Sequence, residues 1–137
     1  MENTNERITI SETKKVLDVS HALLDNSSFR MMKMNNAYFN DVCMTTLKIS
    51  NANLSDLEIE GAQLGGAYIH NIGMPPKGHP AYDENAKQRP LRFENCNLEN
   101  STITNCNLQG AAFNHCNMAG TTINGILVED LLKSYHE

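Results

Sequence analysis

Residues 91–125 read LRFEN CNLEN STITN CNLQG AAFNH CNMAG TTING, seven consecutive blocks of five. The third residue of every block is large and apolar: Phe93, Leu98, Ile103, Leu108, Phe113, Met118 and Ile123. The residue two places before each of these apolar centres is mostly small, as at Cys96, Cys106 and Cys116. A period of five matches neither the 3.6 residues of a helical turn nor the two of a strand. The stretch therefore indicates a repeat architecture.

The same period begins much earlier in the chain, in a different phase. Its apolar centres are Val19, Leu24, Phe29, Met34, Phe39, Met44, Ile49, Leu54, Ile59, Leu64, Ile69 and Met74. Polar residues, Asn, Asp, Ser, Thr and Gly above all, occupy most positions between the inward pairs. Two inward residues per five predict short extended segments that are joined by tight corners. Asn and Gly suit those corners because both tolerate a left-handed backbone.

One block, Ala52-Asn53-Leu54-Ser55-Asp56, resembles the A-(N/D)-L-x-x consensus of the pentapeptide-repeat proteins in full. The blocks at residues 96–100 and 106–110 match it with Cys in place of Ala. The resemblance implies an all-β solenoid, a right-handed quadrilateral β-helix of about five coils with four pentapeptides in each. Residues twenty apart would then stack at about 4.8 Å, placing Phe93 on Phe113 and Cys96 on Cys116. Cys106 would face inward from the opposite wall.

The pattern predicts one domain, residues 1–137, with repeats at 16–74 and 91–125. Residues 1–15 carry no repeat, and the alternation around Ile8 and Ile10 predicts a short strand in an N-terminal cap. Residues 75–90 contain all four prolines and cannot belong to a β-ladder, so they form a loop insertion. The insertion either projects from a corner or replaces part of a coil, and the sequence leaves both open.

Residues 126–137 are expected to form a short C-terminal α-helix that acts as a cap. Its apolar stripe at helical spacing is Val128, Leu131, Leu132 and Tyr135. So short a helix is not stable alone, so it should pack on the last coil or on a partner subunit, in the second case giving a homodimer.

The chain has 11 basic and 16 acidic residues, a net charge of −5. We therefore expect no direct nucleic-acid binding, which needs a concentrated basic surface. No apolar run approaches the roughly 20 residues of a membrane helix, so no membrane contact is expected. The polar start, residues 1–11, lacks the apolar core of a signal peptide and predicts a cytoplasmic protein with reduced thiols.

The motifs of catalysis are absent from the sequence, which contains no G-x-S-x-G, H-E-x-x-H, Walker A or G-x-G-x-x-G pattern. The five histidines have no metal-ligand spacing, and the repeat itself explains the three regularly spaced cysteines. We expect no enzyme, no catalytic or metal site and no cofactor. Cys96 and Cys116 are the one pair for which redox behaviour is conceivable.

The leading hypothesis is a non-enzymatic interaction or scaffold module with an unidentified protein partner. Its candidate interaction loop holds Lys77, His79, Tyr82, Lys87 and Arg89. One alternative comes from the resemblance to the quinolone-resistance branch, whose members mimic DNA, bind DNA gyrase and often dimerise through a C-terminal helix. The sparse negative charge of this chain argues against that alternative. A second alternative is small-ligand binding at the 75–90 loop.

Overall fold

The computed structural model describes residues 6–135. The chain divides into two compact units, one ending at Gln63 and one beginning at Leu64. In both units, short extended segments alternate with corners, as the five-residue period predicts.

Left-handed backbone recurs at every fifth residue of the repeats, always two places after an apolar centre. In the first unit φ lies between 50° and 64° at His21, Asn26, Met31, Asn36, Asp41, Thr46, Asn51, Asp56 and Gly61. In the second unit the same position is held by Gly66, Asn71, Asn95, Asn100, Asn105, Gly110, His115 and Gly120. The predicted corners are therefore confirmed, and Asn and Gly predominate there because they adopt positive φ at low cost.

Two kinds of corner alternate along the repeats, a feature that the sequence reading did not predict. At most corners whose centre is Leu or Met the chain makes a closed turn, in which the N–H three residues on donates to the carbonyl of the centre, at 3.1 Å for Leu54 and 2.9 Å for Leu108. Positive φ at the third residue is the hallmark of a type II turn. Where the centre is Val, Ile or Phe the corner is a more open bend. β-Branched and aromatic residues favour extended backbone, which suits the open corner.

Inward and outward side chains differ in exposure, as the register predicts. Leu24, an apolar centre, is 55% exposed, whereas Leu23 beside it is 92% exposed. In the first unit the inward side chains converge on a cavity of about 270 Å³, lined by Leu17, Val19, Leu24, Phe29, Met34 and Phe39 among others. Residues from separate five-residue blocks therefore line one common space.

The described residues contain two strands, β1 (Thr122–Ile123) and β2 (Ile126–Leu127), and one helix, α1 (Val128–Tyr135). These strands pair only with each other. The ladder between coils that a right-handed quadrilateral β-helix requires is not among them, so that architecture and its number of coils stay predictions. The strand predicted around Ile8 and Ile10 does not form: residues 6–10 have no ladder partner, and Ile8 is 81% exposed. Residues 1–5 of the predicted cap lie outside the described residues.

The C-terminal segment differs from the uninterrupted helix that we predicted for residues 126–137. Asn124 and Gly125 have φ of 49° and 83° and form the two-residue turn of a hairpin that pairs Thr122 with Leu127 and Ile123 with Ile126. Asn-Gly is the preferred pair for such a turn, because both of its residues need positive φ. Residues 126–127 are therefore a strand, and the helix begins at Val128; residues 136–137 lie outside the described part.

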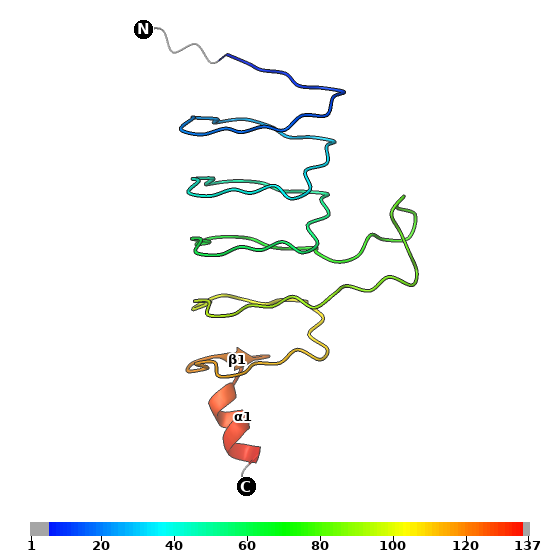
Figure 1. The fold of residues 1–137 in the computed structure, drawn as a ribbon. Coiled ribbons are helices and arrows are strands. Elements are labelled where there is room, and N and C mark those ends of the chain that lie inside the picture. Colours follow the sequence, from blue (N-terminus) through cyan, green and yellow to red (C-terminus); the bar gives the residue numbers. More distant parts are fainter. Residues whose placement is uncertain (1–5, 136–137) are drawn as a thin grey trace. The chain divides into compact units, whose positions relative to one another are not determined.

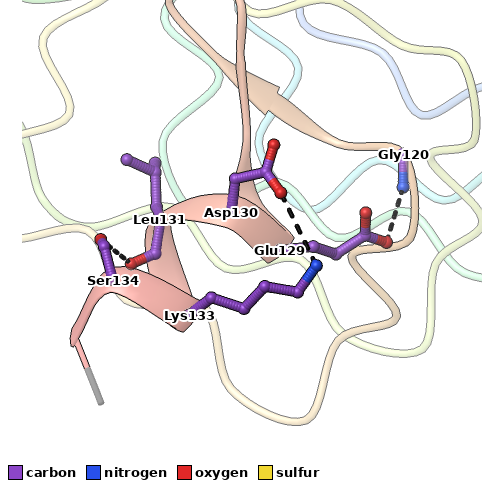
Figure 2. A network of polar contacts seen from close by, with 6 residues as sticks. All are labelled: Gly120, Glu129, Asp130, Leu131, Lys133 and Ser134. Atoms are coloured by element: carbon purple, nitrogen blue, oxygen red, sulfur yellow. Dashed lines mark hydrogen bonds and ion pairs between the residues drawn. The ribbon is translucent and has the colours of Figure 1, made fainter. Parts of the chain in front are cut away.

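Helix α1 is attached to the end of the second run of repeats. Val128 N–H donates to the Thr121 carbonyl at 2.9 Å, and the Glu129 carboxylate accepts from the backbone N–H of Gly120 at 3.3 Å (Figure 2). Glu129 and Asp130 lie in the first turn, where negative charge is favourable, and Lys133 pairs with Asp130 at 3.8 Å (Figure 2). The start of the helix is therefore hydrogen-bonded directly to the last repeat corner, at Gly120 and Thr121.

Candidate functional site

The loop at residues 75–90 is the main departure from the repeats within the second unit. It runs out from the repeats and returns to them, so it projects from the repeats (Figure 1). Three successive turns shape it: His79 N–H donates to Pro76 at 3.0 Å, Tyr82 N–H to His79 at 2.9 Å, and Ala86 N–H to Asp83 at 3.2 Å. The loop thus has backbone structure of its own, although it contains no strand or helix.

Side chains support these turns. The Nδ1 atom of His79 accepts from Ala81 N–H at 3.0 Å, and the Asp83 carboxylate accepts from Asn85 N–H at 2.9 Å. Ala86 and Pro75 are the half-buried residues of the loop. The predicted residues Lys77, His79, Tyr82, Lys87 and Arg89 are exposed and belong to this one projecting segment. The structure therefore presents them together at the surface, and their role stays a prediction.

An aromatic pair just before the loop was missed by sequence reasoning. The rings of Tyr68 and His70 stack, with centroids 4.0 Å apart and an interplanar angle of 14°. The Asn71 side-chain amide lies 3.0 Å from Nδ1 of His70. Residues i and i+2 of an extended segment share a face, so the spacing alone could have indicated the pair.

The predicted apolar stripe of the helix is divided between interior and surface. Val128 is 8% exposed and Leu131 is 38% exposed, whereas Leu132 and Tyr135 are 58% and 85% exposed. Val128 is the single buried residue among residues 6–135. The first half of the stripe packs within the chain itself, and dimer formation through the second half stays a prediction.

All four cysteines are free thiols, and all are exposed. Cys96, Cys106 and Cys116 each donate to the carbonyl two residues before, at 3.3, 3.4 and 3.4 Å. This identical local geometry agrees with a position set by the repeat, and the Cys96–Cys116 disulfide is not formed. Within residues 6–135, no three His, Cys, Asp or Glu side chains gather as a metal site would require.

Asparagine side chains brace the closed turns from the position before the centre. The Oδ1 atoms of Asn53, Asn97, Asn107 and Asn117 each accept from the backbone N–H two residues on, at 3.0 or 3.1 Å. This contact gives the Asn of the A-(N/D)-L-x-x pattern a structural role.

Comparison with known families gives one match: the family model described as Pentapeptide repeats (8 copies) fits residues 92–126. The match covers the second run of repeats and supports the resemblance to the family. No curated protein and no solved structure matches the chain. In residues 6–135, the single helix is too short to cross a membrane.

Proposed function

We propose that this chain is a non-enzymatic interaction module of the pentapeptide-repeat family, in which the loop at residues 75–90 contacts a protein partner. The observation that supports this is the projecting loop itself, which has its own turns and exposed basic and aromatic side chains. A loop anchored at both ends to a regular scaffold loses less freedom on binding than a disordered segment does. The repeats supply that anchorage on both sides.

The helix and the repeat corners are explained by structural roles, which leaves the loop as the segment most available for contact. Val128, Glu129 and the bracing asparagines all take part in contacts within the chain. Pentapeptide repeats generally serve as interaction or scaffold modules, and the match at residues 92–126 agrees with that role.

The test replaces residues 77–89 by a short Gly/Ser linker and compares the proteins that co-purify with the full chain. We expect a specific partner to be lost from the linker variant. The control carries Lys33→Ser and Lys48→Ser, which remove exposed cations from the first unit and leave the loop intact. Both variants should melt cooperatively, because neither changes an inward side chain. An unchanged set of partners for a folded linker variant would refute the proposal.

A further inference from the structure

We propose that the loop and the segment leading into it form a hydrogen-bond donor surface for an acidic segment of a partner protein. Tyr68, His70, Lys77, His79 and Lys87 carry this surface. The inference rests on the proposed function, because it names the chemistry of the partner that the loop contacts. It assigns the partner's carboxylates as the groups that are recognised.

The imidazole of His70 has its acceptor nitrogen occupied within the chain. The neighbouring group is the Asn71 amide nitrogen, 3.0 Å from Nδ1. An amide nitrogen can only donate, so Nδ1 accepts and the proton of the neutral ring is on Nε2. Stacking on Tyr68 at 4.0 Å holds the ring in place. His70 can therefore offer its Nε2–H group to a partner as a hydrogen-bond donor, whereas its acceptor atom, Nδ1, is already used within the chain.

His79 has the same arrangement inside the loop. The Ala81 N–H donates to its Nδ1 at 3.0 Å, which again leaves the proton on Nε2. Two imidazoles close in sequence thus present N–H donors, and the Tyr68 hydroxyl and the ammonium groups of Lys77 and Lys87 add more. Carboxylates, which only accept when ionised, are the complementary side chains on a protein partner.

The distribution of charge along the chain also favours an acidic partner. Residues 75–90 contain Lys77, Lys87 and Arg89 against Asp83 and Glu84, a net of 3 − 2 = +1, while the whole chain has −5. The remaining residues therefore carry −5 − 1 = −6, so the loop is a positive segment of an acidic chain. Opposite charge across an interface steers association and selects the partner. A net of +1 with two carboxylates in the same loop is little for a phosphate backbone, so an acidic protein segment fits better than a nucleic acid.

The test uses the full chain and fluorescein-labelled poly-L-glutamate, with binding followed by anisotropy at low ionic strength and pH 8. One variant carries Lys77→Glu and Lys87→Glu, and the matched control carries Lys33→Glu and Lys48→Glu in the first unit. Each pair of changes lowers the net charge by four, from −5 to −9. We expect the loop variant to lose affinity about tenfold or more and the control about twofold, because screened charges act mainly on near neighbours.

The histidines are tested separately, since charge alone does not require them. Replacing both His70 and His79 by Ala should weaken poly-L-glutamate binding about threefold or more, because each ring offers an N–H donor to a carboxylate. The control is His115→Asn, which changes an exposed histidine at a corner where Asn is well tolerated. It should leave the affinity unchanged, and thermal melting should be alike for all variants.

Four results would overturn the inference: no binding of poly-L-glutamate by the unmodified chain, equal losses in the two lysine variants, no loss on replacing both histidines, or duplex DNA binding as tight as poly-L-glutamate. Self-association that the loop variant abolishes would place the acidic surface on a second copy and overturn it too. A different result would refute the proposed function, namely a Gly/Ser linker variant that keeps every cellular partner. If that variant loses a partner although poly-L-glutamate does not bind, the proposed function is supported and only the inference about acidic partners is refuted.

Discussion

The two runs of repeats, residues 16–74 and 91–125, follow the same five-residue path with different corner residues. In the second run the left-handed corners hold Asn or Gly at all positions but His115. In the first run His21, Met31 and Thr46 also occur there. The family model matches the second run alone. The comparison teaches that the inward apolar period keeps the same backbone path even where the corner residues vary, and that the run matched by the family model is the one with the more uniform corners.

The asparagines that brace the closed turns also differ between the two runs of repeats. Within residues 6–135, Asn Oδ1 accepts from a turn N–H at Asn97, Asn107 and Asn117 in the second run and at Asn53 in the first. The turn hydrogen bonds themselves occur in both runs, for example at Leu24 and Leu108. The first run therefore makes the same turns with less help from side chains.

The largest loss of stability should come from changing an inward apolar residue, because the two runs share the inward apolar period. We expect Leu24→Asp to lower the free energy of unfolding by about 3 kcal/mol, because a carboxylate would replace an inward side chain that lines the apolar cavity of the first unit. The measurement is urea unfolding followed by circular dichroism. Leu23→Asp is the matched control, since that neighbouring side chain is 92% exposed, and it should change stability by less than about 0.5 kcal/mol. Equal losses in the two variants would contradict the register.

Much of the local structure could be predicted from the sequence because it is set by residues close together in the chain. The corners follow from a large apolar residue and a residue tolerant of positive φ two places later, as at Leu54 and Asp56. The four prolines marked residues 75–90 as a break for an equally local reason. The helix and its buried first residue, Val128, followed from apolar spacing.

The features that the sequence did not predict depend on a choice between alternatives of similar local cost. The prolines exclude residues 75–90 from a β-ladder, but they do not determine whether the loop projects from the repeats. The apolar pattern at residues 126–137 suited a helix, but the Asn124-Gly125 turn drew Ile126 and Leu127 into a hairpin. The five-residue period gives no indication of the Tyr68–His70 stack, because it places both residues outside the inward positions. The candidate loop residues lie on one exposed segment, and their role stays a prediction because it depends on a partner that the chain does not contain.

A smaller effect, this time an increase in stability, is expected at the Met31 corner of the first run. No corner of the second run holds a Met. Met31 has a φ of 52°, and its side chain is fully exposed. We expect Met31→Asn to raise the free energy of unfolding by about 1 kcal/mol, because Asn adopts left-handed backbone at lower cost. Met32→Asn is the control: this inward residue is half-exposed at 52%, and a polar replacement there should destabilise. Stabilisation by both changes, measured as the shift of the urea midpoint, would show that the gain does not come from the corner.

The smallest effect concerns the asparagine contacts that distinguish the second run. Asn107 Oδ1 accepts from the backbone N–H of Gln109 at 3.0 Å, next to the closed turn at Leu108. Asn107→Ala should lower the free energy of unfolding by about 0.5–1 kcal/mol, the usual net value of one such hydrogen bond. Gln109→Ala provides the control, since it retains the donor N–H and changes only an exposed side chain, and it should alter stability by a few tenths of a kcal/mol at most. If Asn107→Ala proved as mild as that control, the side-chain contact would add nothing to a turn that Leu108 and Gly110 already hold. The weaker bracing of the first run would then have no cost in stability, and the difference between the two runs would lie in the backbone preferences of their corner residues alone.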